Sequence, residues 1–276
     1  MARVIFAKIR LPIFSIKYPE SFQIMSSMPV PQPSSLIGAL AYCIGVSTGV
    51  GTRAYSSVIE MVSRGEILAA RARPLEERAG TPLTLSPVVL RRFRIVDKAH
   101  ETKKKGETKP IERLSSALAR GDTAEAKRLL EVNLTDAFYR EYAMGYDILC
   151  AWIVRGDAVR PEVLRLIQRL GDTESLCSVL DVWSESVEVF EDRVVETPFP
   201  APAVEEARVL EGSFMYAKMC DEMRVLRPFI IPCTFRMERR RGMRYPTVRP
   251  SRVKIDYGRN VEACETSYGS IVLARG

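Results

Sequence analysis

The chain opens with an alternating pattern that predicts a β-strand from Ala2 to Lys17. One face of this strand carries only apolar side chains, namely Ile5, Ala7, Ile9 and Leu11. Successive side chains of a strand point to opposite faces, so an unbroken apolar face of this length is expected to lie against the core.

A proline-rich stretch follows, and then a pattern typical of an amphipathic helix. Ser34 and Ser35 precede apolar residues spaced three and four apart, which predicts that these serines form the N-cap. Gly49 and Gly51 are expected to end this helix, and a second, shorter one is predicted over Ala54–Arg64.

The remaining periodic segments predict a mixed chain. Strands are expected over Ile67–Arg73, Val88–Val96, Tyr146–Val154, Leu176–Val189, Val225–Phe235 and Val253–Ala263. Helices are expected over Arg160–Leu170 and, as two short pieces separated by Gly121-Asp122, within Ile111–Val132. The lysine-rich stretch Lys98–Pro110 is expected to be a loop.

Up to Val189 the order is strand, helix, strand, insertion, strand, helix, strand, which is the plan of an α+β, ferredoxin-like (RRM-like) domain. We place this domain at residues 1–196, with a thumb-like insertion at about 97–145. Three prolines in Thr197–Val204 predict a boundary, and residues 205–276 are expected to form a smaller β-rich segment.

Composition narrows the class of protein. The chain has 276 residues, 46% of them hydrophobic, which is enough for a substantial core. No apolar run reaches the ~18 residues of a membrane span, so a cytoplasmic protein without a membrane partner is expected. The six cysteines form no CxxC pair and His100 is the single histidine, so no metal site and no cofactor are predicted. Only three Gln and two Asn stand against many charged residues, a weak indication of a thermophile.

The net charge of +7 is concentrated in two stretches. Thr234–Arg259 holds nine basic and two acidic residues, and Arg91–Lys109 holds eight basic and three acidic ones. Much of the compensating negative charge lies in Glu185–Glu211. Blocks of one sign attract polyanions, and the first block interleaves arginine with Phe235 and Tyr245, and also with Tyr257, a combination that suits phosphate contact and base stacking. A solvated charged loop is the structural alternative, most of all for Lys103–Lys105.

Two sequence motifs add a resemblance. The N-terminal strand is followed by Pro29-Val30-Pro31-Gln32-Pro33-Ser34-Ser35-Leu36-Ile37-Gly38-Ala39-Leu40, and Arg169-Leu170-Gly171-Asp172-Thr173-Glu174-Ser175 follows later. Together with Tyr139-Arg140-Glu141-Tyr142, these stretches resemble the CRISPR-associated protein family five of the RAMP superfamily, as far as about Val189.

The resemblance implies a function. Members of that family cap the 5′ handle of the guide RNA (crRNA) in type I Cascade complexes and abut the backbone subunit. The length and the lysine-rich insertion are similar to the archaeal type I-A branch, and the large subunit is a further partner. We therefore expect a non-catalytic RNA-binding subunit for antiviral defence.

Candidate RNA-binding residues come from four places. They are Ser34 and Ser35 at a helix start, Gly171, Thr173 and Ser175 in a turn, Arg91, Arg92, Lys103, Lys104 and Lys105 in the basic stretch Arg91–Lys109, and Arg236, Arg239, Arg240, Arg241, Arg244 and Tyr245 in the C-terminal segment. A helix N-terminus offers free N–H groups to a phosphate, but plain capping explains Ser34 and Ser35 equally well. A turn that fixes the next strand likewise explains Gly171 to Ser175.

Three other hypotheses stay open. Some relatives in another subtype cut repeat RNA with tyrosine, lysine and histidine, so Tyr42, His100, Lys98 and Lys103 could be drawn together as a metal-independent endoribonuclease site. The lysines of Lys103–Lys105 could instead contact target DNA within the same complex. The chain could also be a purely structural adaptor.

Overall fold

We analysed the protein as a computed structural model, which describes residues 2–21, 24–75, 83–93, 99–102, 106–171, 175–240 and 242–273. The chain divides into two compact units. The larger consists of Met1–Ser86 with Glu141–Gly276, and the smaller is Pro87–Arg140.

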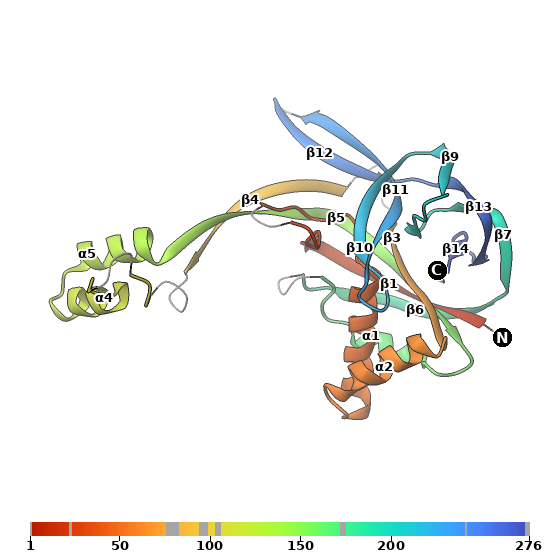
Figure 1. Ribbon diagram of the computed structural model, residues 1–276, viewed down its shortest axis with the longest axis horizontal. Helices are drawn as coiled ribbons and strands as arrows, with labels where there is room; N and C mark the ends of the chain where they lie inside the picture. The colour runs from red at the N-terminus through yellow and green to blue at the C-terminus, as the bar shows by residue number, and fades with distance from the viewer. Residues whose placement is uncertain are drawn as a thin grey trace. The chain divides into compact units, whose positions relative to one another are not determined.

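A four-strand arrangement forms the centre of the larger unit (Figure 1). Strand β1 (Ala2–Phe14) lies between β5 (Thr135–Arg155) and β6 (Ser178–Val187) and is antiparallel to both. Strand β3 (Ile67–Leu75) pairs antiparallel with the other edge of β5, which gives the order β3-β5-β1-β6. The apolar face predicted for β1 is confirmed, because all four of its side chains are fully buried in the main core.

Further strands extend this sheet and build a second one. The larger sheet also contains β2 (Ile24–Met25), β4 (Leu83–Phe93), β8 (Ala201–Pro202), β10 (Phe214–Cys220), β11 (Leu226–Arg240) and β12 (Met243–Pro250). The second sheet contains β7 (Val189–Thr197), β9 (Arg208–Gly212), β13 (Val253–Cys264) and β14 (Ile271–Val272). An α+β fold is therefore confirmed.

Two helices lie beside the central strands (Figure 1): α1 (Pro33–Thr48) and α2 (Arg53–Ser63). Their apolar side chains join the core formed by one face of β1, β3 and β5. The indole Nε1 of fully buried Trp152 on β5 donates to the Leu36 carbonyl of α1 at 3.2 Å, which satisfies a polar atom that the core would otherwise leave unpaired.

The ends of two predicted helices need correction. The first begins at Pro33, because proline's fixed φ suits the first helical position, so Gln32 is the N-cap and not Ser34 or Ser35. Its end is as predicted, with Gly49 in the left-handed conformation at φ 72°. In place of an α-helix over Arg160–Leu170, the chain forms a short 3₁₀ helix, η2 (Pro161–Leu166).

Leu164 is the buried residue of η2, and at Ile167 the backbone is already extended, with ψ 116°. Ile167 and Leu170 are also buried but lie beyond the helix, so the buried residues of this segment do not form one helical stripe.

The stretch Thr197–Val204, expected to be a domain boundary, lies in the interior instead. Thr197, Phe199 and Ala201 are fully buried, and the Thr197 hydroxyl donates to the Ser270 carbonyl at 2.6 Å. Prolines disfavour regular structure without preventing burial, and here they sit where the chain passes between the two sheets through β8, which pairs with β11.

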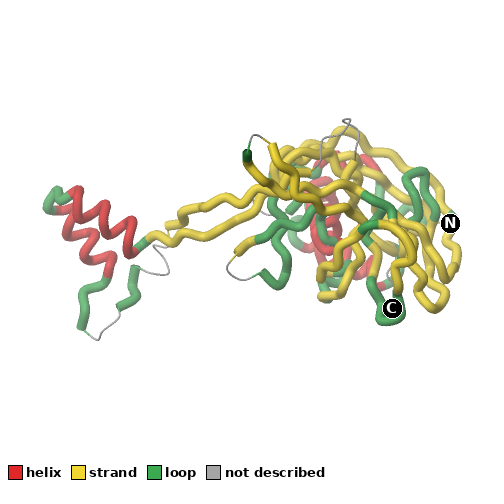
Figure 2. The backbone as a smooth tube through the Cα atoms, turned by 90° about the horizontal axis from the view of Figure 1, so that it is seen from above, coloured by secondary structure: helices red, strands yellow, loops and turns green. Residues whose placement is uncertain are grey.

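The smaller unit carries a compact helical end. Helices α4 (Pro110–Ala119) and α5 (Thr123–Arg128) lie side by side (Figure 2), and η1 (Leu129–Asn133) continues the second as a single π turn. Its own small apolar core consists of Ala99, Leu114, Ala117, Ala126, Leu129 and Leu134. The predicted pair of short helices is confirmed, with Asp122 as the N-cap that accepts from the Glu125 backbone N–H.

Within the described part of the chain, no helix combines the length and the apolar character needed to cross a membrane.

Candidate nucleic-acid interface

The hairpin formed by β11 and β12 carries most of the described arginines predicted to bind RNA. The two strands pair from Cys233↔Pro250 to Arg240↔Met243, so side chains alternate between two faces of the hairpin. The sequence predicted β11 as far as Phe235 but missed β12. Its signal in the sequence is Gly242, since glycine takes the positive φ that tight hairpins require, here 82°.

One face of the hairpin combines exposed apolar groups with arginine. Phe235 and Met237 are 56% and 60% exposed, although both are large hydrophobic side chains. Arg239 follows on the same face and lies directly opposite Arg244, and both arginines are exposed. A flat apolar surface bordered by guanidinium groups is suited to stacking with bases while the arginines contact phosphates.

The other face is partly neutralised. Glu238 forms an ion pair with Arg249 at 3.4 Å and accepts a hydrogen bond from the Thr247 hydroxyl at 3.3 Å. Tyr245, opposite Glu238 in the register, is half-buried, whereas Arg236 on this face is exposed. Tyr245 therefore offers less ring surface for stacking than Phe235 does.

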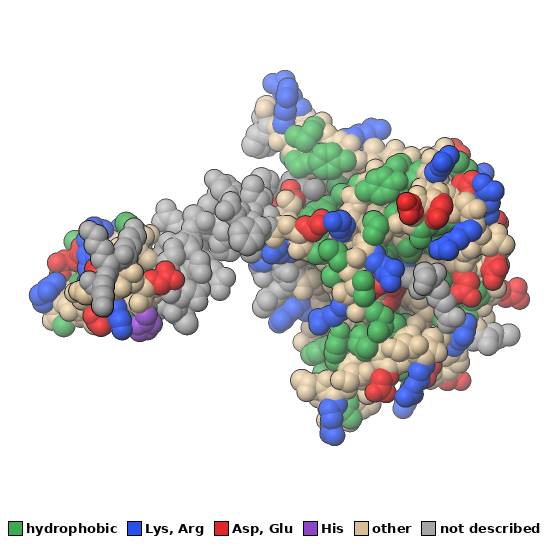
Figure 3. Space-filling view, viewed as in Figure 1, with side chains coloured by type: hydrophobic (Ala, Val, Ile, Leu, Met, Phe, Trp, Pro, Cys, Tyr) green, Lys and Arg blue, Asp and Glu red, His purple; other side chains and the backbone are tan. Residues whose placement is uncertain are grey.

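Arg236, Arg239 and Arg244 have no carboxylate within ion-pair distance among the described residues. Figure 3 shows basic side chains at the end of this hairpin and hydrophobic ones next to them. Like charges directly opposite each other destabilise a strand pair, so Arg239 and Arg244 are expected to gain from an anion placed between them. This site can bind phosphates.

The rest of the basic segment is different, because acidic residues from a distant part of the chain lie beside it. Strand β13 pairs with β7 and β9, both from the acidic stretch Glu185–Glu211. Lys254 lies opposite Glu196 on one side and Glu211 on the other, and Arg252 lies 3.9 Å from Glu196. Tyr257, which had been counted among the interleaved aromatic residues, is 1% exposed. Within this basic segment, the nucleic-acid candidate is therefore the β11–β12 hairpin.

The turn that contains Gly171 has a structural role. Ser175 is fully buried, and its Oγ accepts from the Ser15 backbone N–H at 3.1 Å and donates to the Ser15 carbonyl at 3.3 Å. Gly171 has φ +112°, and a Cβ there would lie 2.9 Å from Cγ1 of Ile16. These contacts fix the turn against the end of β1 and favour the structural interpretation over contact with RNA.

The serines at the start of α1 are half-buried, and their side chains make no hydrogen bond to described residues. Gln32 before them is occupied: its Oε1 accepts from the Cys220 N–H at 2.7 Å and its Nε2 donates to the Lys17 carbonyl at 3.3 Å. The helix start is thus tied to β10 by Gln32, which leaves Ser34 and Ser35 as candidates without further support.

Several predicted site residues cannot be placed. Lys103, Lys104, Lys105, Thr173 and Arg241 lie outside the described residues, and the side chains of Arg91, Arg92 and Arg240 do as well.

The residues considered for catalysis lie in different units. Tyr42 is on α1 of the larger unit and is 49% exposed, whereas His100 is an exposed turn residue of the smaller unit. Lys98 and Lys103 are outside the described residues. Burial raises the pKa of the thiols of Cys43 to about 12 and of Cys177 to about 11, so both are protonated at neutral pH and poor nucleophiles.

Comparison with known proteins agrees with the sequence resemblance. No protein-family model matches the chain. A CRISPR-associated protein Cas5 of Thermoproteus tenax is 30% identical over 176 residues, which cover 63% of this chain. Over this region the chain is similar in sequence to that Cas5 protein. The matched region spans 62% of the length of that relative.

Solved structures resemble the fold. A CRISPR protein from Archaeoglobus fulgidus matches 99% of both chains with a TM-score of 0.55 and 16% identity, which supports a common fold. A chain of a CRISPR RNA-guided surveillance complex reaches a TM-score of 0.40 at 12% identity over 91% of both chains, which is too low to support an inference.

Proposed function

We propose that this chain is a non-catalytic RNA-binding subunit of a type I-A CRISPR Cascade complex, where it caps the 5′ handle of the crRNA and contacts the backbone subunit in antiviral defence. The observation that carries the proposal is the β11–β12 hairpin, where opposed arginines without carboxylate partners adjoin exposed Phe235 and Met237. The relationship to Cas5 supports it.

The central sheet supports the ferredoxin-like part of the proposal. The four strands are antiparallel in the order β3-β5-β1-β6, and α1 and α2 lie between β1 and β3 along the chain. Both features agree with a ferredoxin-like domain. In this interpretation η2 takes the place of the second helix. The strand β4 and the smaller unit are then an insertion between the second and third strands, consistent with a thumb.

The hairpin is expected to bind single-stranded RNA mainly through phosphates. For single strands the slope of log K against log salt is about −0.7 per neutralised phosphate. If Arg236, Arg239 and Arg244 each contact one phosphate, replacing all three by glutamine should flatten that slope by about 2 and weaken binding at low salt.

Charge reversal of Arg239 tests the hairpin. The Arg239→Glu variant should bind an RNA with the repeat-derived 5′ handle more weakly than the parent chain. It should be as stable or more stable, by about 0.2–1 kcal/mol, because glutamate would lie opposite Arg244. Loss of binding without loss of stability separates a contact role from a folding role.

The matched control is Arg208→Glu, which changes the net charge equally at an exposed arginine of β9 in the acidic region. It should leave RNA affinity close to the parent value. Filter binding of the isolated chain, and co-purification of the other Cascade subunits, would measure both variants. Equal affinities for Arg239→Glu and Arg208→Glu would remove the hairpin from the proposal.

The absence of catalysis is tested separately. Pure protein incubated with repeat RNA in EDTA should give no specific cleavage products. Cleavage at one position that disappears in His100→Ala would establish the endoribonuclease function in its place.

A further inference from the structure

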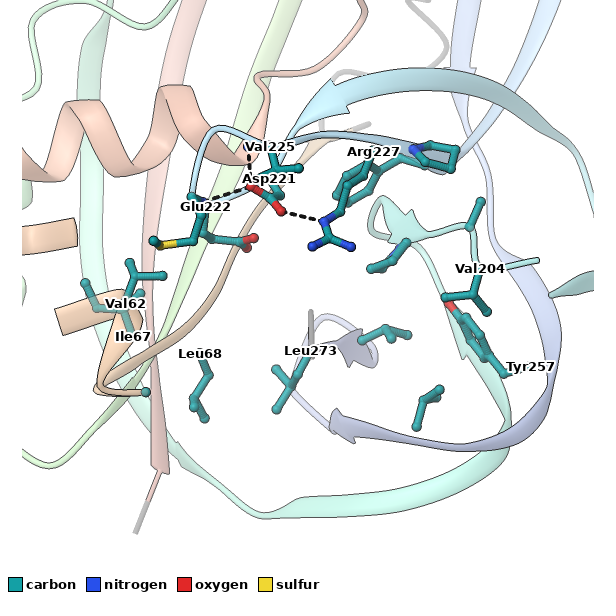
Figure 4. Close-up of a pocket in the computed structure, with 18 of the residues that line it drawn as sticks. Val62, Ile67, Leu68, Val204, Asp221, Glu222, Val225, Arg227, Tyr257 and Leu273 are labelled. Atoms are coloured by element: carbon teal, nitrogen blue, oxygen red, sulfur yellow. Dashed lines mark hydrogen bonds and ion pairs between the residues drawn. The ribbon is translucent and has the colours of Figure 1, made fainter. Parts of the chain in front are cut away.

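The larger unit contains a cavity of about 750 Å³, which Arg236, Arg239 and Arg244 of the hairpin do not line. It lies between the α2–β3 connection and the second sheet (Figure 4), and much of its wall is apolar, including Ile67, Leu68 and Leu273. Its volume is within the range of about 300–1,000 Å³ that small-molecule sites have.

A few polar groups converge on this apolar space. Tyr257 is 1% exposed and lines the cavity, yet its hydroxyl has no hydrogen-bond partner among the described residues. Buried polar groups are nearly always paired, so an unpaired hydroxyl beside a cavity indicates a group that a ligand would satisfy. This hydroxyl can both donate and accept.

A carboxylate supplies an acceptor. Glu222 is 4% exposed, and its Oε1 accepts from the Ala70 N–H at 2.9 Å and from the guanidinium of Arg71. Its Oε2 makes no hydrogen bond to described residues. In Figure 4 the carboxyl group of Glu222 points into the cavity. The charge is balanced by Arg71, so the free oxygen is available as a hydrogen-bond acceptor without a large excess of negative charge.

Two guanidinium groups lie at the same cavity. Arg227 donates through Nε to Asp221 at 2.7 Å, which leaves its two terminal nitrogens for another anion, and its side chain is 52% exposed. Arg259 also lines the cavity and is exposed. Asp221 is fully engaged, because its other oxygen accepts from the Met223 and Val225 N–H groups at 2.9 and 2.8 Å.

The backbone next to these groups is held in an unusual conformation. Arg224 has a positive φ of +63°. Among the described residues it is the one residue other than glycine with a positive φ. The bonds of Asp221 and the position of the Arg224 guanidinium, 5.0 Å from the Tyr55 ring centre, keep this turn in place. Strain of this kind persists where the surroundings fix it, often at ligand sites.

We propose that this cavity binds a single nucleotide, either free or as an unpaired residue of an RNA chain. The apolar wall takes the flat base, Glu222 accepts an N–H of the base edge, the Tyr257 hydroxyl completes the polar contacts, and Arg227 with Arg259 binds the phosphate. A simple apolar ligand would leave the buried hydroxyl and carboxylate oxygen unpaired, whereas the edge of a base presents both donors and acceptors. Unpaired bases are commonly bound in this manner, with apolar contact on the ring and hydrogen bonds at its edge.

The proposal is tested with the full chain and the four nucleoside 5′-monophosphates by titration calorimetry. At least one should bind with one-to-one stoichiometry, and its nucleoside, which lacks the phosphate, at least tenfold more weakly. Tyr257→Phe retains the ring and should weaken binding about threefold to tenfold, as expected for one hydrogen bond.

A second variant does not depend on changing the core. Val225 is 49% exposed where it lines the cavity, so Val225→Trp should block the site and abolish binding without unfolding the protein. Val46→Trp is the matched control, because Val46 is 52% exposed on α1 and does not line the cavity. The affinity of the Val46→Trp variant for the monophosphate should equal that of the parent chain.

RNA binding then identifies the source of the nucleotide. If Val225→Trp also weakens binding of the handle RNA, the nucleotide belongs to the RNA. If RNA binding is unchanged, the ligand is a free nucleotide. No binding of any monophosphate at millimolar concentration, or equal binding by Val225→Trp and the parent, would overturn the proposal. Neither result bears on Arg239→Glu, so failure here is distinct from failure of the proposed function.

Discussion

Removing the carboxylate of the buried Arg71–Glu222 pair should destabilise the larger unit strongly. The Arg71 side chain is 0% exposed and that of Glu222 is 5% exposed, so neither charge is solvated by bulk water. Arg71 also lies with its Cζ 5.4 Å from the ring centre of Phe229 and donates to the Val272 carbonyl at 3.4 Å. The pair thus joins β3 to the β10–β11 turn and to the second sheet.

The magnitude follows from what Glu222→Ala leaves behind. Among the described residues, the buried guanidinium loses its one carboxylate partner, and its Nε already lacks a partner there. The Ala70 N–H loses its acceptor as well. Breaking a buried pair in this way costs about 3–5 kcal/mol. For a chain of this size each kcal/mol lowers the melting temperature by roughly 2–4 °C, so a drop of about 6–20 °C is expected.

The assay is urea unfolding of four proteins: the parent, Glu222→Ala, Arg71→Met, and the double variant Arg71→Met/Glu222→Leu. The double variant buries no unpaired charge, so it should be much closer to the parent than the sum of the single effects. Glu60→Ala is the control, because its pair with Arg64 is 67% and 65% exposed and is worth at most about 0.5 kcal/mol. If Glu222→Ala costs less than about 1 kcal/mol, or if the single effects add in the double variant, the reasoning about desolvation is wrong.

Two further predictions concern the turn after η2 and an exposed carboxylate. Gly171→Ala should cost more than about 1 kcal/mol in urea unfolding, because φ is +112° and the new Cβ would lie 2.9 Å from Cγ1 of Ile16. Gly38→Ala should be neutral or stabilising, by up to about 1 kcal/mol, since apart from its own helix backbone and chain neighbours no atom of the described residues lies within 4 Å of its Cβ position. Equal effects of the two substitutions would contradict this account. The pKa of Asp256 is lowered from 3.8 to about 2, chiefly by the hydrogen bond from Arg193. Its contribution to stability is therefore present above pH 3.8 and lost as the pH falls toward 2, so Asp256→Asn should unfold with a shallower pH dependence in that window, and a carbon-detected NMR titration should give the pKa directly. An ordinary carboxyl pKa would show that the ion pair with Arg193 does not form in solution.

The sequence predicted those elements whose signals are local. The alternation in β1 and the glycine that ends α1 each depend on neighbouring residues, and so do the two short helices on either side of Gly121-Asp122. The same kind of reasoning placed the N-cap two or three residues late, because proline competes with serine at a helix start.

The candidate interface was only partly predictable. The concentration of basic residues after Thr234 is visible in the sequence, but two of them, Arg252 and Lys254, lie beside acidic residues of β7 and β9. Residues about 45 to 60 positions apart are brought together there by strand pairing, and no local pattern records that register. The cavity around Tyr257 is equally non-local, since α2, β3, β8, β11 and β13 all contribute to it.

The sequence by itself determined the α+β class, the basic character and the resemblance to Cas5, because these follow from periodicity, composition and motifs along the chain. Only the tertiary structure decided which charges remain available. Pairing of β13 with acidic strands places Glu196 beside Arg252 and Lys254, whereas the hairpin register sets Arg239 against Arg244. The physical reason is that electrostatic energy depends on distance in space, and strand register sets that distance.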